Sequence, residues 1–414
     1  MTAWTPDWAV SINGAGDVTN VTLANLTITS GREDIYSQPY AGYCNVELIN
    51  LNQSPINIDV NDAVVIKVKD STGTYVNLFG GDVTDIDVEV TSSGTGGINE
   101  RIKIVALGAL AKLPKILTDG VLSKDYDGNQ IYSILSALLF GNWNSVPAAL
   151  TWADYTPTTT WANAQNTGLG TIDQPGDYEL TARSADVTDV YSLVSGLATS
   201  GLGYLYEDAS GRINYADSTH RSQYLAANGY VEVTGNHALA NGIRTSKRIG
   251  DLRNKVTIKY KANATETATD ATSIAIYGEQ GQIIDTSIEA QADAEDQAAF
   301  YLSLRAYPQD QFRAITFPLT SPEIDDSDRD NLLNVFMGQP LDITDLPSNM
   351  VDGRFQGFVE GWTFSAGYNR LDLTLILSPI AYSLQAMKWE NVPVTETWNT
   401  ISPTLEWINA TIVA

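Results

Sequence analysis

Short alternations of apolar and polar residues fill the first 110 residues of the chain. Alternation with a period of two is the mark of a half-buried strand. In the first of these runs the pattern changes phase near Asn25, which predicts a register shift there. The runs and their ranges are VTLANLTITS (21–30), CNVELINL (44–51), AVVIKVK (63–69), VNLFGGDVTDIDVEV (76–90) and RIKIVALGAL (101–110). About six strands without a helix favour a small barrel or sandwich.

The pattern then changes to helical spacing. In GNQIYSILSALLF (128–140) the apolar residues recur every three or four positions, as on one face of a helix. A second helix is predicted from Ser184, which can cap its start, to Gly201, which can end it. A hairpin around a DASG turn follows at 203–217. Residues 111–240 are therefore predicted to form an inserted α+β domain.

Strand patterns return over residues 241–385. NKVTIKYKA (254–262) is predicted to be a strand, and TSIAIYGEQGQIID (272–285) a hairpin around its GEQG turn. A helical insertion is expected at about 287–306, with acids in its first turn. The region closes with QGFVEGWTFSAGYNRLDLTLILS (356–378), two alternating runs around a turn.

The two β regions share one device, because Phe and Gly precede an alternating run both in 78–90 and in 356–378. This echo predicts an internal duplication. The fold is expected to be mainly β, with two similar small β-barrels, at 1–110 and 241–385, and an α+β domain at 111–240 inserted between them. If the barrels superpose, Phe358 should lie near the place of Phe79. Residues 386–414 are left as a Trp-rich C-terminal segment.

Composition limits the classes of function. With 49 acidic against 24 basic residues the net charge is −25, which disfavours a nucleic-acid-binding face because phosphate contacts need Lys and Arg. The single cysteine, Cys44, lies in a strand pattern and is expected to be a small buried residue. We see neither a signal peptide at the N-terminus nor an apolar run long enough to span a membrane.

Candidate chemistry is sparse. Asp326, Asp328 and Asp330 have the spacing that begins a calcium loop, but Asn331 and Met337 replace the Gly and Glu that such a loop needs, so a solvated loop is favoured. Nothing in the spacing selects a carboxylate pair for glycoside hydrolysis. Phosphate-binding, dinucleotide-binding and metalloprotease motifs are not found, and His220 is expected to be a surface or capping residue. We therefore expect no enzymatic activity and no cofactor.

Three tryptophans in the C-terminal segment, Trp389, Trp398 and Trp407, recur at intervals of nine residues. In an extended segment this spacing places a large aromatic side chain roughly every 30 Å. Such residues could anchor the segment on a partner protein, because Trp is enriched among interface anchors. They could equally cap the chain's own barrels.

The order of several motifs resembles that of minor tail, or tail hub, proteins of long-tailed bacteriophages. These motifs are a Gly-Arg turn in LTITSGREDIYSQPYAGYCNVELINLN, then FGGDVTDIDV, RIKIVALGALAKL, a helix with a D-x-S-G-R hairpin in DVYSLVSGLATSGLGYLYEDASGRINYAD, NKVTIKY, and an F-x-x-E-G-W ending in FVEGWTFSAGYNRLDLTLILSPI. The resemblance covers most of residues 15–390.

This resemblance implies a homotrimeric structural protein at the phage tail tip, made in the host cytoplasm. Two barrels in each of three chains would match a sixfold tail tube. Implied partners are the distal tail protein or tube ring, the tape-measure protein, and tail fibres or a central spike. DNA would only pass through the channel, and many acids are expected to face that lumen. The alternatives are a carbohydrate-binding or glycoside-hydrolase β protein of the tail or cell surface, and a bacterial surface adhesin, which the missing export signal disfavours.

Overall fold

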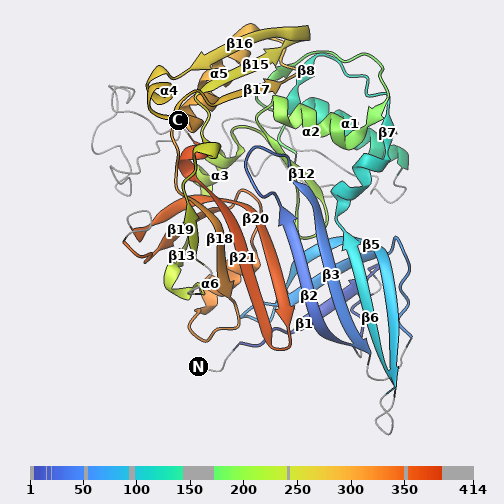
Figure 1. The fold of residues 1–414 in the computed structure, drawn as a ribbon. Helices are drawn as coiled ribbons and strands as arrows, with labels where there is room; N and C mark the ends of the chain where they lie inside the picture. The colour runs from blue at the N-terminus through green and yellow to red at the C-terminus, as the bar shows by residue number, and fades with distance from the viewer. Residues whose placement is uncertain are drawn as a thin grey trace.

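The computed structural model describes residues 4–14, 16–19, 21–50, 55–92, 98–142, 172–239, 243–348 and 353–384. A large twisted sheet occupies the lower half of the molecule, and helices with small sheets form a second packed unit above it (Figure 1). The prediction of a mainly β fold is confirmed. The number of barrels stays a prediction, because twelve strands here belong to a single hydrogen-bonded sheet.

The N-terminal strands form one half of this sheet, in the order β1-β4-β5-β6-β3-β2. The predicted register shift in the second strand is confirmed, since its pairing with the third strand shifts between Leu23 and Asn25. The bounds are β1 (Trp8–Ile12), β2 (Val21–Gly31), β3 (Tyr40–Asn50), β4 (Ala63–Lys69), β5 (Tyr75–Ser92) and β6 (Ile98–Leu107).

Strands from the C-terminal half extend the same sheet in the order β20-β21-β18-β14, with β19 beside β20 and β13 beside β19. The two halves meet where β2 pairs with β20 in antiparallel fashion. The bounds are β13 (Val231–Thr234), β14 (Arg244–Ser246), β18 (Gln311–Pro318), β19 (Pro340–Thr344), β20 (Phe355–Gly367) and β21 (Arg370–Pro379).

A single hydrophobic cluster lies against one face of the sheet and spans both halves. It forms because every second residue of the alternating strands points to this face. In β3, for example, Cys44, Val46 and Leu48 are buried while the residues between them are partly exposed. The expected buried role of Cys44 is thus confirmed.

A second hydrophobic cluster holds the upper unit together, and it joins residues from 109–215 with residues from 256–298. The sequence-based domain boundaries stay predictions, but this packing places 255–305 with the helical unit rather than with the large sheet. The elements are α1 (Asp127–Asn142), α2 (Val190–Ser200), β11 (Tyr204–Glu207), β12 (Ile213–Ala216), β15 (Lys255–Tyr260), β16 (Ala264–Thr269), β17 (Gly281–Asp285) and α5 (Gln291–Arg305).

Shorter elements complete the two units. In the described part of the chain no helix has both the length and the apolar character needed to cross a bilayer. The bounds are β7 (Leu117–Thr118), β8 (Asp125–Tyr126), β9 (Glu179–Leu180), β10 (Thr188–Asp189), α3 (His220–Asn228), α4 (Ala271–Tyr277), α6 (Asp326–Leu333) and the 3-10 helices Ala109–Lys115, Gly235–His237, Ile249–Asp251, Lys261–Asn263 and Ile380–Tyr382.

Two local predictions were wrong. The second helix does not begin near Ser184, because β10 pairs with β7 first and Asp189 then caps the helix by accepting a hydrogen bond from the Ser192 N–H. Residues 272–285 are not a hairpin, because Asp270 caps α4 through the Ser273 N–H and only the second half of the segment is a strand. In both cases an Asp cap decides the local structure.

We expect the Phe364→Ala substitution to lower the free energy of unfolding by about 3–5 kcal/mol, because it leaves a cavity in the shared core. Phe364 lies in β20 and is 1% exposed. Denaturant unfolding measures the loss.

The matched control is Tyr368→Ala, at the turn between β20 and β21, where the side chain is 84% exposed. It should leave the free energy of unfolding unchanged within about 0.5 kcal/mol. Equal effects of the two substitutions would contradict the placement of the core.

Candidate functional site: two sheet repeats and their edges

The two halves of the sheet have the same strand order. In the N-terminal half β2 to β6 lie in the order β4-β5-β6-β3-β2, and in the C-terminal half the corresponding strands lie in the order β19-β20-β21-β18-β14. All of these pairs are antiparallel. The outermost strands differ, because β1 pairs antiparallel with β4 whereas β13 pairs parallel with β19. The chain therefore contains a five-stranded unit twice.

The two units also have a β-bulge at the same place, between their fourth and fifth strands along the chain. The ladder between β5 and β6 shifts between Val83 and Asp85, and the ladder between β20 and β21 shifts between Val359 and Gly361. A bulge of this kind inserts one unpaired residue into a strand. Aligning the two bulges makes Glu360 the counterpart of the residue between Val83 and Asp85.

The same alignment corrects the expected match between the repeats. It pairs Phe79 with Phe355, and both side chains are buried in the large cluster. Phe358 falls three residues further along β20, where it packs in a separate small cluster with Ile380 and Leu384. The two segments do correspond as strand pairs in the two repeats. The residue that corresponds to Phe79 is Phe355, however, and not Phe358.

The junction between the halves depends on a very close approach of two backbones. Gly31 ends β2 with a φ of +89°, and a Cβ there would lie 2.3 Å from the Glu360 carbonyl oxygen. The next residue, Arg32, donates its backbone N–H to the same oxygen at 2.8 Å. A glycine is required because a positive φ and this proximity exclude other side chains.

A buried ion cluster reinforces the junction. Glu360 is 1% exposed, and its carboxylate accepts from the Arg32 Nε at 2.8 Å and from the Arg221 Nη1 at 2.7 Å and Nη2 at 2.9 Å. The Ser378 hydroxyl also donates to it at 2.5 Å. The Tyr204 ring contacts both guanidiniums. Residues from α3, β20, β21 and the position directly after β2 thus meet at one carboxylate.

Burial alone would raise the pKa of Glu360, but the Arg221 and Arg32 guanidiniums beside it lower that pKa to about 2. The carboxylate is therefore charged at any ordinary pH. A buried charge is stable only when it is paired and fully hydrogen-bonded, and this one accepts from three side chains.

The D-x-S-G-R hairpin lies against the first repeat. Its turn residues Ser210 and Gly211 approach Gly80 of β5 so closely that a Cβ on Gly80 would lie 2.4 Å from the Ser210 carbonyl carbon. The Asn77 side chain donates to the Ser210 hydroxyl at 3.1 Å. This contact explains Gly80, whereas a Cβ on the following Gly81 would lie 2.4 Å from the Leu107 carbonyl oxygen of the neighbouring strand.

The Gly-Arg turn, the E-G-W ending and this hairpin were recognised in the sequence as separate motifs. Their contacts in the folded chain were not predicted. The ion cluster itself was missed. Arg221 has no local signal in the sequence, because its pairing with Glu360 joins residues 139 positions apart. Only the buried Glu in a strand of alternating apolar residues could have suggested a paired charge.

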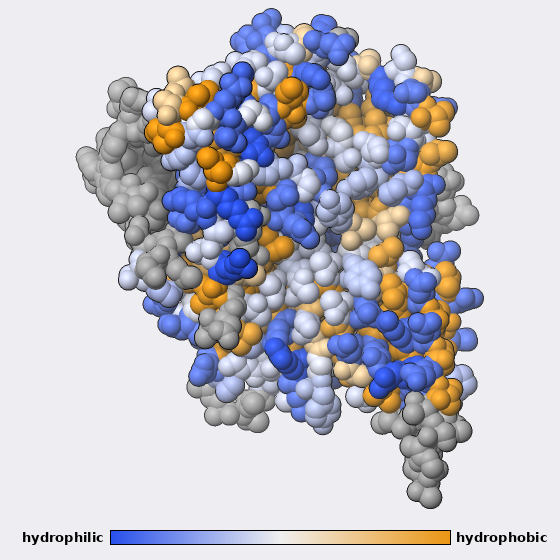
Figure 2. Space-filling view, in the orientation of Figure 1, coloured by the Kyte–Doolittle hydropathy of each residue, from blue (hydrophilic) through white to orange (hydrophobic). Residues whose placement is uncertain are grey.

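Several strand edges are open in the part of the chain that the structure describes, and two of them belong to the strands that correspond to the junction strands β2 and β20. On its β4 side β5 is paired only as far as Asp82, with two further backbone bonds at Val83. On the side away from β18, β14 pairs with no strand within the ranges that the structure covers. Val88 and Val90 near the end of β5 are 59% and 57% exposed, and hydrophobic side chains are visible in this region at the lower right of Figure 2. Open, partly apolar edges are sites for pairing with another strand.

The three acids with calcium-loop spacing each contact a different residue of the chain rather than converging on one point. Asp326 pairs with Arg329, the Asp328 carboxylate lies 2.9 Å from the His237 ring nitrogen, and Asp330 accepts from the turn after β4. Asp326 begins the helix α6 rather than a calcium loop. Trp389, Trp398 and Trp407 lie outside the described residues.

His220 is not a surface residue. It is 4% exposed at the start of α3, and its ring nitrogen lies 2.6 Å from the Asp173 carboxylate. Burial lowers the pKa of His220 and the Asp173 carboxylate raises it, with a net upward shift. Asp173 also accepts from the Asp217 N–H at 3.0 Å. These groups bind one another in the interior.

No family model and no curated protein matches the sequence. Solved structures do match the fold. A 43 kDa tail protein of prophage MuSo2 from Shewanella oneidensis is similar over 91% of this chain and 99% of its own, with 13% identity and a TM-score of 0.53. A tail protein from Neisseria meningitidis MC58 is similar over 92% of this chain and 98% of its own, with 10% identity and a TM-score of 0.55. The chain therefore has the fold of these tail proteins.

Glu360→Gln should lower the free energy of unfolding by about 3–5 kcal/mol, because it leaves two buried guanidiniums without their counter-charge. The control is Glu47→Gln, which breaks a more exposed pair with Arg101 at 2.7 Å and should cost less than about 1 kcal/mol. A small effect at Glu360 would mean that the cluster does not hold the junction.

The same cluster predicts a dependence of stability on acid. Because the folded pKa of Glu360 is about 2 and its ordinary value is 4.5, its contribution is present above about pH 4.5 and is lost as pH falls towards 2. Unfolding measured across this window should show a shallower pH dependence for Glu360→Gln than for the unmodified protein. Parallel curves would contradict the ion pairing.

Proposed function

We propose that this chain is a structural, non-enzymatic hub protein of a bacteriophage tail tip and that it works as a ring of three copies. The duplicated five-stranded unit carries the proposal. Two repeats in each of three copies give six similar positions, the number that a sixfold tail tube presents. The shared fold with two prophage and bacterial tail proteins supports a role in the tail.

The repeats indicate how the ring would close. Inside the chain, β2 of the first repeat pairs with the far part of β20 in the second. The corresponding strands are β14 and β5, and each of them has an open edge. If β14 pairs with β5 of the next copy, every junction in the ring is built alike. A head-to-tail contact of this kind closes into a ring when its rotation permits.

The register of this contact follows from the intrachain junction, in which Thr29 lies opposite Thr363. By the alignment of the repeats, Ser246 corresponds to Thr29 and Asp87 to Thr363. Ser246 would therefore lie opposite Asp87 of the next copy. The Ser246 hydroxyl is shielded from solvent and has no hydrogen-bond partner in the described part of the chain, and the Asp87 carboxylate would accept from it.

Charge complementarity supports the same register. Counting outwards from Ser246, Arg244 lies opposite Glu89 and Arg248 lies opposite Asp85, on one face of the sheet. All four side chains are exposed in the single chain. Opposite charges on facing strand positions stabilise a sheet. A basic RTSKR segment is unusual in a chain with 49 acids and 24 bases, and an acidic DIDVE segment is its natural partner.

The face of the sheet opposite the large core would line the channel. This face carries threonine hydroxyl groups. The hydroxyl oxygens of Thr29 and Thr363 lie 3.4 Å apart across the junction, and those of Thr316 and Thr374 lie 2.9 Å apart between β18 and β21. Neutral hydroxyls with surrounding acids would let DNA and a tape-measure protein pass without being held. The acidic lumen stays part of this proposal.

The remaining partners are also proposed. The hub would sit between the tail tube or distal tail protein above and fibres or a central spike below, in the assembled virion. Trp389, Trp398 and Trp407 are proposed as anchors for one of these partners. DNA would be in transit only.

Light scattering on the purified protein should give three times the mass of one chain. The double charge reversal R244E/R248E should shift it to the mass of one chain, because acids would then face Glu89 and Asp85 across the proposed contact.

The decisive control restores complementarity. Adding D85K/E89K to the same chain exchanges the two charge patterns and should restore the trimer. The reversal K255E/K259E/K261E, on exposed bases of the upper unit, should leave the mass unchanged. A trimer that survives the first reversal, or a chain that is always monomeric, would overturn the proposed contact.

A further inference from the structure

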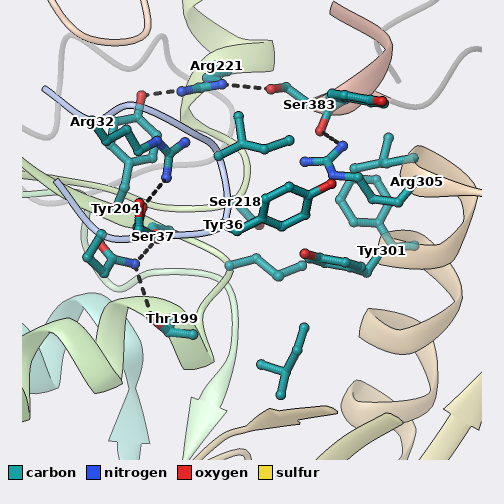
Figure 3. Close-up of a pocket in the computed structure, with 18 of the residues that line it drawn as sticks. Arg32, Tyr36, Ser37, Thr199, Tyr204, Ser218, Arg221, Tyr301, Arg305 and Ser383 are labelled. Carbon is teal, nitrogen blue, oxygen red and sulfur yellow. Dashed lines mark hydrogen bonds between the residues drawn. The ribbon is translucent and has the colours of Figure 1, made fainter. Parts of the chain in front are cut away.

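A cavity of about 140 Å³ lies between the upper unit and the sheet. Arg305 and Tyr301 reach into it from α5, Tyr36 points towards them from the loop after β2, and Arg32 and Arg221 lie at its other end (Figure 3). This volume is well above the roughly 10–15 Å³ that one water molecule needs. The cavity can hold a small polyatomic ligand.

The charges that line the cavity do not balance. Three guanidiniums line it, those of Arg32, Arg221 and Arg305. Glu360, just behind the first two, supplies one negative charge to both. The lining carboxyl is that of Asp217, and burial together with the Asp173 carboxylate raises its pKa well above the ordinary range, which favours its neutral form. The cavity is therefore cationic in a strongly acidic chain.

Arg305 is the guanidinium without a counter-charge. It is 6% exposed, and no carboxylate pairs with it among the described residues. Its Nη1 donates to the Tyr382 carbonyl oxygen, and the Tyr36, Tyr301 and Tyr382 rings surround it. Its Nε is buried and has no hydrogen-bond partner within the described ranges.

Such a group is costly. An unpaired buried charge is rare in proteins, because desolvation opposes it unless a counter-ion and hydrogen bonds compensate. Burial lowers the pKa of Arg305, yet a guanidinium stays protonated in proteins. Aromatic rings offset part of the cost, but they do not accept the Nε–H. An anion in the adjoining cavity would do so.

We propose that this cavity is a binding site for a small oxyanion of the phosphate or carboxylate class, with Arg305 as its principal ligand. A guanidinium offers a planar fork of N–H donors that matches the paired oxygens of such anions. The Arg32 and Arg221 guanidiniums add long-range attraction, although their own N–H groups are engaged with Glu360, Ser37 and Ser383. The buried lining suits a small ion better than a polymer.

The bound anion would join three separate segments. Arg305 belongs to α5 in the upper unit, Tyr36 to the loop after β2, and Tyr382 to the short helix after β21. Neutralising Arg305 would therefore stabilise the contact between the upper unit and the sheet. This inference is independent of the ring proposal, since every residue in it comes from one chain.

The probe is inorganic phosphate, compared with acetate and with potassium chloride at equal ionic strength, on the full chain. Phosphate should raise the melting temperature in a saturable way, on the order of a few degrees, and isothermal titration calorimetry should detect one site per chain. Acetate as the stronger ligand would identify a carboxylate as the natural class. A response no larger than that to chloride would overturn the proposal.

Variants assign the site. Arg305→Met keeps the apolar stem and should abolish the phosphate response, while Arg101→Met, at an exposed pair on β6, should retain it. If Arg305→Met does not fold, Arg305→Lys keeps the charge but loses the fork and should weaken binding by about tenfold. Unchanged phosphate affinity in either folded Arg305 variant would place the anion elsewhere and contradict the proposal.

Discussion

The backbone edge of a β-strand must be paired or protected, and this constraint governs the whole molecule. The chain satisfies it once internally, where β2 adds to β20 and joins two five-stranded units into one sheet. Gly31 makes the approach possible, and the buried Glu360 carboxylate ties the strands to α3 through Arg221. Among the described residues the same constraint is also unmet along β14 and at the end of β5, and pairing with another copy is the proposed way to meet it.

The upper unit shows how the repeat could be enlarged without disturbing its strand order. One connection, between β6 and β13, carries α1, α2 and the β11–β12 hairpin, and another, between β14 and β18, carries β15 to β17 with α5. Both connections pack into one cluster. They return to the sheet through specific contacts, such as Ser210 on β5 and Arg221 on Glu360. The insertions thus contribute contacts that stabilise the junction.

Much of this fold could be predicted from the sequence, because alternation identifies strands directly. The long strands β2 to β6, β20 and β21, the helices α1 and α5, the phase change at Asn25 and the existence of a repeat follow from local patterns, whereas the short strands β13, β14 and β16 were not predicted. The cap of α2 was predicted at Ser184 instead of Asp189, and the cap Asp270 was missed because its segment was predicted to be a hairpin. The ion cluster and the Arg305 cavity were not predictable. They depend on long-range contacts, such as that between Arg305 and Tyr382, which no local pattern encodes.

The central claim is that β14 pairs with β5 of a neighbouring copy in a fixed register, and a disulfide tests it most directly. Cysteines placed at Ser246 and Asp87 would face each other across the contact, and facing positions on paired strands are close enough to oxidise. The single native cysteine, Cys44, is buried and should not form competing disulfides. Oxidation of the double variant, followed by denaturing electrophoresis without reductant, should give a covalent trimer as the largest species. Monomers alone, or a ladder that continues beyond three, would contradict the account.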